Sequence, residues 1–258
     1  LTERPPSVAE SLDALVANER LSVSVVAHEP EVIDPVAIRF DEQGRLWVVE
    51  MHDYPTGPIE GQPPGGRIRI LVDQDQDGRF ELATTFADQL LFPTGIQPWK
   101  GGVIVTLAGN IVFLEDRDGD LRCDHVETWF EGFAEQNEQL RANHPLLGPD
   151  GRVYVAGGLR GGRIVSKSPL WQNEEPAIDL RGADFAFDPH GGFFGAVSGN
   201  SQFGLTIDDY GHRMGCSNRN PAMEAILSLE ALGAIDGSDV LTRIETSAWR
   251  EAIASCVR

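Results

Sequence analysis

Two short stretches of the sequence concentrate carboxylates at the spacing of a calcium-binding loop. Alternate side chains of a loop that wraps around a cation converge on it, and Ca²⁺ takes about six to eight oxygen ligands. A glycine at loop position six permits the sharp turn that such a loop needs. In the first stretch the acidic residues at positions one, three, five and nine are Asp73, Asp75, Asp77 and Glu81, and the glycine is Gly78.

The second stretch repeats this spacing, and Asp116 follows Asp73 by 43 residues. Neither stretch is a complete EF-hand loop, because Thr84 takes position twelve in the first and Leu121 takes the glycine position in the second. Two such stretches at equivalent places predict two calcium sites, and the alternative is a pair of solvated acidic turns. The candidate ligands of the second stretch are Asp116, Asp118, Asp120, Asp124 and, at position twelve, Glu127.

Polar residues also gather where predicted strands meet the centre of the fold. His52 follows one strand, and Arg141, Asn143 and His144 precede the start of another. His144 is a candidate general base, and Arg141 is a candidate cation beside an anionic cofactor or a developing charge. His52 and Asn143 are candidate cofactor ligands. The alternative for this segment is a loop that only hydrogen-bonds its own backbone before the strand begins.

Composition excludes several partners and chemistries. The net charge of −19 would repel nucleic-acid phosphates and anionic lipid headgroups, so neither is expected to bind. No apolar run is long enough to cross a bilayer directly. The sequence contains no GxSxG, HExxH, P-loop or GxGxxG motif, and common hydrolase, zinc-protease and nucleotide chemistries therefore lack support.

The elements that would position these residues are short β-strands joined by Asp- and Gly-rich turns. One turn pattern recurs, with glycine at residues 44, 151 and 191, each time between an apolar strand and a returning aromatic or β-branched strand. Four strands per repeat of about 43 residues is the pattern of a β-propeller blade. The predicted strands are residues 36–40, 46–51, 68–72 and 81–87 in blade one, and residues 94–99, 103–107, 111–115 and 125–133 in blade two.

The fold class is therefore predicted to be all-β, a β-propeller with short helical segments at both ends. Blade three is expected to begin near His144 and blade four near Ala183. Residues 1–30 are interpreted as a leader that packs on the propeller, residues 31–221 as the blades, and residues 222–258 as a helical tail or truncated end. The apolar spacing of Met223, Ile226 and Leu227 favours helix there, as does a second set formed by Val240, Leu241, Ile244, Trp249 and Ile253. About four blades need not close a ring, so an incomplete larger ring, for example one of six blades, is a second interpretation.

Cysteine usage leaves the cellular compartment open. Cys123, Cys216 and Cys256 allow one disulfide with a free thiol, or three free thiols, and they form no CxxCH haem motif. The chain begins at Leu1 rather than Met, which suits a mature form after signal removal or a piece of a longer protein.

Several of these segments together resemble the membrane-bound dehydrogenase propellers of planctomycete-type bacteria. They are residues 34–50, the two acidic stretches, residues 92–96 and residues 203–211, and the resemblance covers roughly residues 8–221. Those domains are similar to soluble glucose/sorbosone dehydrogenases, which are six-bladed propellers that use pyrroloquinoline quinone and calcium. Leu140 stands near the place where those enzymes carry their base, whereas the segment from Arg219 to Pro221 resembles one of their Arg-Asn-Pro elements.

The resemblance implies an exported, extracytoplasmic protein, periplasmic or secreted. It implies a quinoprotein-type oxidoreductase that acts on a sugar or polyol, with calcium and possible pyrroloquinoline quinone as cofactors. A cytochrome c is the electron acceptor that this resemblance suggests. The alternative is a propeller without catalysis, whose channel binds a glycan or a partner protein.

Overall fold

The structure is a computed structural model that describes residues 4–171 and 177–229. These residues fold as a β-propeller of antiparallel sheets, with one short helix, α1 (Val8–Asp13), before the first strand. Ser7 caps this helix, because its side chain accepts a hydrogen bond from the Glu10 N–H and the Glu10 carboxylate accepts one from the Ser7 N–H. None of the helices in the described part of the chain is long and apolar enough to cross a membrane.

Blades one and two have the strands that the sequence predicts. Successive side chains of a strand point to opposite faces of the sheet, and the middle strands of both blades are buried on both faces. In blade one the strands are β1 (Pro35–Phe40), β2 (Leu46–Met51), β3 (Gly66–Val72) and β4 (Leu82–Leu90), paired in that order. In blade two they are β5 (Gly95–Trp99), β6 (Gly102–Leu107), β7 (Asn110–Glu115) and β8 (His125–Phe133).

The prediction that blade four begins near Ala183 is wrong. A detour formed by β11 (Gly162–Ser166) and β12 (Ile178–Asp179) leaves the third blade and pairs with the outer strand β8 of blade two. The segment after Ala183 then returns to β10, so it is the third strand of blade three. Blade three consists of β9 (Asn143–Leu147), β10 (Val153–Ala156), β13 (Asp184–Phe187) and β14 (Phe194–Val197).

A fourth sheet follows, and it also corrects a prediction. It contains β15 (Phe203–Ile207), β16 (Arg213–Cys216) and β17 (Met223–Glu224) in that order. Helix was expected from Met223, but Met223 pairs with Gly215 because the turn through Pro221 returns the chain to β16. The second predicted helix of the tail lies outside the described residues. Cys123 and Cys216 are free thiols, and Cys256 also lies outside the described residues.

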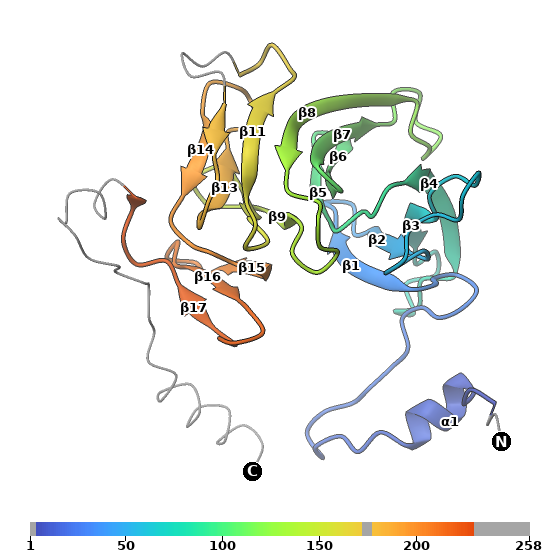
Figure 1. The fold of residues 1–258 in the computed structure, drawn as a ribbon. Coiled ribbons are helices and arrows are strands. Elements are labelled where there is room, and N and C mark those ends of the chain that lie inside the picture. Colours follow the sequence, from blue (N-terminus) through green and yellow to red (C-terminus); the bar gives the residue numbers. More distant parts are fainter. Residues whose placement is uncertain (1–3, 172–176, 230–258) are drawn as a thin grey trace.

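The blades pack face to face around a central axis, with β1, β5, β9 and β15 innermost (Figure 1). Alternate residues of one strand serve two interfaces, because neighbouring side chains point to opposite faces. In β6, Val103 and Val105 pack toward blade one, whereas Ile104 packs toward blade three. The second interface is rich in aromatic contacts, and the Phe130 ring lies 5.1 Å from Phe185 and 5.0 Å from Phe187 between ring centroids.

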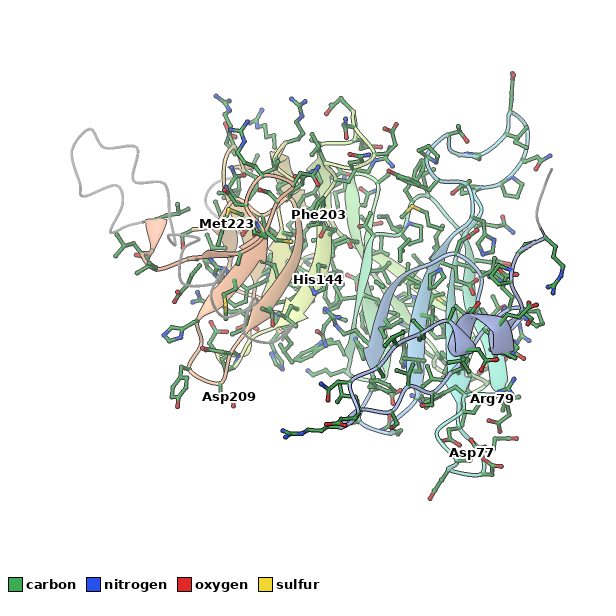
Figure 2. All side chains as sticks on the ribbon, turned by 90° about the horizontal axis from the view of Figure 1, so that it is seen from below. Asp77, Arg79, His144, Phe203, Asp209 and Met223 are labelled. Atoms are coloured by element: carbon green, nitrogen blue, oxygen red, sulfur yellow. The ribbon has the colours of Figure 1, made fainter. Side chains whose placement is uncertain are left out.

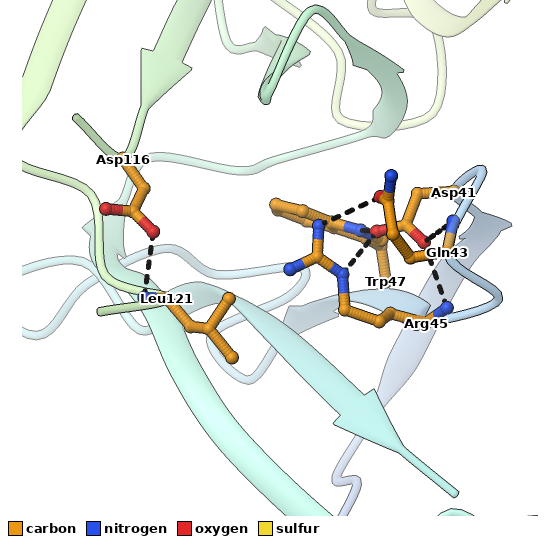
Figure 3. A network of polar contacts seen from close by, with 6 residues as sticks. All are labelled: Asp41, Gln43, Arg45, Trp47, Asp116 and Leu121. Carbon is orange, nitrogen blue, oxygen red and sulfur yellow. Dashed lines mark hydrogen bonds and ion pairs between the residues drawn. The ribbon is translucent and has the colours of Figure 1, made fainter. Parts of the chain in front are cut away.

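The first hairpin turn is fixed by a buried carboxylate (Figure 3). Asp41 accepts hydrogen bonds from the backbone N–H groups of Gln43 and Arg45, from Arg45 Nε at 2.6 Å and from Trp47 Nε1 at 2.8 Å. Although desolvation opposes ionisation, these donors hold the pKa of Asp41 below its usual value. The network joins the turn to Trp47, which is part of the core between blades one and two.

Replacing this carboxylate should destabilise the whole propeller. Asp41→Ala leaves the buried Trp47 N–H and the Arg45 guanidinium without their acceptor, and it should lower the free energy of unfolding by about 2–4 kcal/mol. Asp179→Ala, which removes an exposed partner of Arg181, should change it by less than about 1 kcal/mol. Equilibrium urea unfolding measures both, and equal losses would contradict this role of Asp41.

Candidate functional site

A central cavity of about 640 Å³ lies among the innermost strands. It brings together three residues that the sequence analysis selected as site residues: Arg141, Asn143 and His144. His52 lines an adjoining cavity of about 410 Å³, and the two cavities share Val36, Met51 and Tyr54. The other residues that line the central cavity are Thr94, Glu138, Gln139, Phe203, Gly204, Cys216 and Asn218.

His144 is already engaged within the protein. Arg39 Nη2 donates a hydrogen bond to His144 Nε2 at 2.7 Å, so this bond joins the inner strand of blade one to that of blade three. Burial and the nearby Arg39 charge lower the pKa of His144 to about 4, although a backbone hydrogen bond at Leu205 acts in the opposite direction. The imidazole is therefore neutral at pH 7, but its Nε2 lone pair is not free to take a substrate proton.

Arg141 and Asn143 also make structural contacts. The Arg141 guanidinium lies 4.1 Å from the centroid of the Phe92 ring and donates twice to the backbone oxygen of Glu135. The Asn143 amide donates to the backbone oxygens of Arg141 and Gln202 and accepts from the Gly204 N–H. The Asn143 contacts connect the start of blade three to the start of β15, whereas the bonds from Arg141 to Glu135 lie within the loop before β9.

His52 is held by the buried carboxylate of Glu50. His52 Nε2 lies 3.2 Å from Glu50 Oε2, and Glu50 also pairs with Arg67 and accepts from the Ile33 N–H. The side chain of Glu50 is completely buried, so these partners are needed to offset its desolvation. His52 lies at the edge of this ionic cluster, and its ring borders the smaller cavity.

A third cavity, of about 550 Å³, lies between blade three and the β15–β17 sheet and is more densely lined by hydrogen-bonding groups. Of its polar residues the sequence analysis identified only the segment that begins at Arg219. It shares Asn218 with the central cavity. The polar residues that line this third cavity, called the polar cavity below, include Asp184, Asn200, Arg213, Asn218, Arg219, Asn220 and Glu224.

Asp184 forms the buried wall of the polar cavity. It accepts hydrogen bonds from the N–H groups of Gly157 and Ser201 and from the Ser201 hydroxyl. Burial raises the pKa of Asp184, and these hydrogen bonds together with Arg213 oppose the rise. A side chain at Gly199 would place its Cβ 2.2 Å from Asp184 Oδ2, so only glycine fits there. The sequence analysis did not select Asp184, and the signal that could have identified it is an acidic residue at the start of an apolar strand.

Arg213 also lines this cavity and has one donor without a described partner. Its Nη2 donates to the backbone oxygen and hydroxyl of Ser198, and its guanidinium lies 4.7 Å from the centroid of the Tyr154 ring. Its buried Nε makes no hydrogen bond with any described residue. Arg219 is exposed, and no described residue pairs with it. The cavity thus combines two guanidinium groups, which can bind an anionic group of a ligand, with the carboxylates of Asp184 and Glu224.

The two acidic loops have the same backbone geometry. In each loop the position-six N–H donates to the position-one carboxylate, at 2.9 Å for Asp73 and 2.8 Å for Asp116. Positions four and six have positive φ in both loops, and Leu121 adopts φ 64° where the first loop has Gly78 at φ 92°. Leu121 therefore takes the conformation that glycine provides in the first loop, while its side chain packs against the core between blades one and two.

Three carboxylates in each loop approach one another within 4.8 Å. They are Asp73, Asp75 and Glu81 in the first loop, and Asp116, Asp118 and Asp120 in the second. The remaining candidates have other partners or positions: Asp77 accepts from the Arg79 N–H, Asp124 accepts from the Arg117 N–H, and Glu127 lies on β8 opposite Phe113. Both loops join a third strand to an outer strand, and Figure 2 shows Asp77 far from His144.

Because the pKa of His144 is lowered in the folded chain, the free energy of unfolding depends on pH. The stabilising contribution of His144 is fully present above its ordinary pKa of 6.5 and is lost as pH falls toward about 4, since only the unfolded chain takes up the proton readily. The loss should reach about 3 kcal/mol. His144→Gln keeps an acceptor for Arg39 and should remove most of this loss of unfolding free energy between pH 7 and pH 4.5. Urea unfolding at the two pH values measures it. His125→Gln, which changes a side chain without a partner among the described residues, is the control and should keep the wild-type pH dependence of stability. If His144→Gln also kept it, this assignment would be wrong.

Comparisons with known proteins find distant similarity in structure. The PQQ domain of a pyranose dehydrogenase from Coprinopsis cinerea matches with a TM-score of 0.46 and 14% identity, over 70% of this chain and 42% of that chain. A Trichoderma reesei member of carbohydrate-active enzyme family AA12 matches with a TM-score of 0.39 and 17% identity, over 60% of this chain and 36% of that chain. The chain thus spans less than half the length of either structure.

A third structure, described as a 6-phosphogluconolactonase from Bacteroides uniformis, matches with a TM-score of 0.33 and 10% identity, over 76% of this chain and 85% of that chain. The search of curated proteins found no match. One family model matches residues 7–251, which is nearly the whole chain. This chain therefore belongs to the family described as a domain of unknown function, DUF7133.

Proposed function

We propose that this chain is a propeller domain of a quinoprotein-type oxidoreductase, which oxidises a sugar or polyol with pyrroloquinoline quinone and also binds calcium. The observation that carries the proposal is the polar cavity, which is lined by Arg213, Arg219 and three asparagines. The resemblance of the sequence to membrane-bound dehydrogenase propellers supports the same conclusion.

The residues of the polar cavity fit this cofactor. Pyrroloquinoline quinone carries carboxylates, which guanidinium groups bind with paired hydrogen bonds. Arg213 and Arg219 both line the cavity, so either guanidinium would offer donors to a cofactor carboxylate. Asn200, Asn218 and Asn220 offer amide donors for further carboxylate or carbonyl oxygens. Arg219 would close the outer side of the cavity.

When bound, pyrroloquinoline quinone would supply the acceptor for the hydride, two electrons with one proton, that leaves the alcohol carbon of the substrate. Oxidation of the alcohol also releases the hydroxyl proton, which a nearby base must take. Glu224 is the best candidate among the residues of the cavity, because its carboxylate makes no hydrogen bond or ion pair with another described residue, although its backbone pairs with β16. Asp184 would act differently, since its oxygens already accept three hydrogen bonds and hold the Gly157 and Ser201 segments in place.

Calcium would bind to the two acidic loops and stabilise the turns. Clustered carboxylates repel one another, and a divalent cation removes that repulsion. One oxygen of the first cluster supports this assignment, since Asp73 Oδ1 is buried and makes no hydrogen bond with a described residue. Both loops lie at the outer strands, so the role of this calcium would be structural and not part of the reaction.

An extracytoplasmic location, periplasmic or secreted, belongs to the same proposal, because the resemblance is to exported domains. The two electrons taken from the substrate would have to leave this domain before the next turnover. The acceptor would be a separate redox protein or module, and a cytochrome c is the expected one. The acidic surface of this chain, with a net charge of −19, would favour a basic partner.

A propeller that binds a glycan or protein without catalysis is the second candidate. One observation favours it: His144, Arg141 and Asn143 border the central cavity, yet all three are hydrogen-bonded to other parts of the protein. The cavity would then act as a binding surface only. Turnover that requires quinone separates the two candidates.

Isothermal titration should detect quinone binding that depends on the polar cavity. Arg219→Ala should weaken binding of pyrroloquinoline quinone about tenfold or more, because it removes a charge-assisted pair of hydrogen bonds. Arg181→Ala provides the matched control, since that arginine is 87% exposed and lies outside both cavities. A dye-linked assay with sugars and polyols then tests turnover. If the wild-type chain binds no quinone, the oxidoreductase proposal fails and the binding propeller is favoured.

Calcium should raise the thermal midpoint of the chain. A ligand at about 100 times its Kd adds about 2.7 kcal/mol to stability, which corresponds to a few degrees in a domain of this size. The double variant Asp73→Asn with Asp75→Asn should lose part of this response, and Asp116→Asn with Asp118→Asn should lose most of the rest. Asp209→Asn, in the β15–β16 turn, is the control. Equal midpoints in chelator and in millimolar calcium would show that the loops are solvated acidic turns.

A further inference from the structure

Arg141 is a nearly buried cation without an acidic partner in the described part of the chain. It is only 8% exposed, and no ion pair between described residues includes it. Two buried carboxylates differ in this respect, because Asp41 and Glu50 are each paired with an arginine. A buried charge usually needs a partner, since it has lost much of its contact with water. An anion from outside the described chain would therefore be stabilised beside Arg141.

The guanidinium of Arg141 has donors left for such an anion. Nε and Nη2 both donate to the backbone oxygen of Glu135, at 3.3 and 3.2 Å, and the group lies over the Phe92 ring. Nη1 makes no hydrogen bond with a described residue, and it is not among the partnerless atoms that are closed off from solvent. Hydrogen bonds form at the edge of a guanidinium and not at its face, so Phe92 leaves this edge open. Because Arg141 lines the central cavity, we expect Nη1 and the second N–H of Nη2 to be reached from there.

Other polar side chains of the central cavity are neutral groups that can bind hydroxyls. Those of Tyr54, Gln139 and Asn218 line the cavity and make no hydrogen bond with a described residue, although the backbone N–H groups of Gln139 and Asn218 do. A phenol and two amides can donate to, and accept from, the hydroxyl groups of a sugar or polyol. Met51 and Phe203 add apolar surface that suits the C–H groups of such a ligand. The cavity thus combines one cation with neutral groups for hydroxyls.

The charges around the central cavity suit a ligand with a single negative charge. Glu138 is the one acidic residue among the described residues that line it, and it is exposed. Arg39, which donates to His144 in the cavity wall, is a second cation without a carboxylate partner among the described residues. At about 0.15 M salt the Debye length is about 8 Å, so negative charges on distant parts of the surface are largely screened. The two nearby arginines should therefore outweigh the net charge of −19 for a monoanionic ligand.

We propose that the central cavity binds a sugar acid, a sugar or polyol with one carboxylate, and that this carboxylate lies on Arg141. The Nη1 and Nη2 N–H groups donate in parallel to the two carboxylate oxygens. The hydroxyl groups of the ligand bind to Tyr54, Gln139 and Asn218. A phosphate fits less well, because it carries nearly two negative charges at pH 7 and Glu138 would repel the second.

The position of this cavity relates the sugar acid to the proposed reaction. Asn218 lines both the central cavity and the polar cavity, so the two cavities adjoin at this residue. A sugar acid held by Arg141 would present a hydroxyl-bearing carbon toward the polar cavity, where the quinone is proposed to bind. The carboxylate is not oxidised and only orients the ligand. The role as substrate rests on the proposed function, whereas binding of the carboxylate to Arg141 does not.

Isothermal titration with glucuronate, without quinone and at about 0.15 M salt, tests the proposal. The wild-type chain should bind glucuronate about tenfold or more tightly than glucose, which has a hydroxyl group in place of the carboxylate. Arg141→Gln should abolish this preference. Glu138→Gln, at an exposed position, should strengthen glucuronate binding about threefold and leave glucose binding unchanged. Glu42→Gln removes an equal charge from a turn outside the cavities, so this matched control should leave both affinities unchanged.

Circular dichroism checks that Arg141→Gln is folded, and Glu138→Gln decides the test if it is not. Equal affinity for glucuronate and glucose, or no glucuronate binding, overturns the proposal, and so does tighter binding of glucose 6-phosphate than of glucuronate. Glucuronate binding that both variants leave unchanged overturns it as well. Displacement of glucuronate by pyrroloquinoline quinone would assign the cavity to the cofactor and would also overturn it.

The outcome for the proposed function is separate. Glucuronate binding that depends on Arg141, in a chain that binds no quinone, would support the sugar-acid site and reject the oxidoreductase. Quinone-dependent oxidation of neutral sugars by a chain that does not bind glucuronate would support the oxidoreductase and reject the sugar-acid site.

Discussion

The fold depends on apolar packing between successive blades. A four-stranded sheet with apolar residues on both faces is stable only when each face is covered, because burial of apolar area is the main stabilising contribution. β2 shows the constraint directly: its consecutive residues Leu46, Trp47, Val48 and Val49 are all buried, and they alternate between two clusters. The same constraint sets the order of blades around the axis, and thereby the positions of the cavities between them.

The local β-structure could be predicted from the sequence, since it follows from short-range patterns. Period-two alternation and the Asp/Gly turns gave the strands of blades one and two nearly to the residue. The detour through β11 and β12 could not be predicted, because the choice of partner for β11 depends on the face of Trp129 and Phe130 in a distant strand. The helix expected at Met223 does not form for a similar reason. Met223 and Glu224 pair with β16, and this pairing outweighs the local apolar spacing.

Site residues were harder to predict than strands. His144, Arg141 and Asn143 do line the central cavity, but sequence does not show that Arg39, 105 residues from His144 in the chain, takes the imidazole lone pair. The polar cavity depends on contacts between blade three and the β15–β17 sheet, so Arg213 and Asp184 become neighbours only in the folded chain. In contrast, the geometry of the acidic loops could be predicted from the sequence, since each loop is a single hairpin turn of consecutive residues.

The central claim is that Arg213 and Arg219 hold the carboxylates of a quinone cofactor. Arginine Nε–H resonances in a ¹H–¹⁵N spectrum report this directly, because the buried Arg213 Nε has no acceptor among the described residues of the free chain. On addition of pyrroloquinoline quinone, the Arg213 and Arg219 resonances should shift and saturate together, whereas that of the exposed Arg181 should stay in place. Unchanged Arg213 and Arg219 resonances at saturating quinone would contradict the claim.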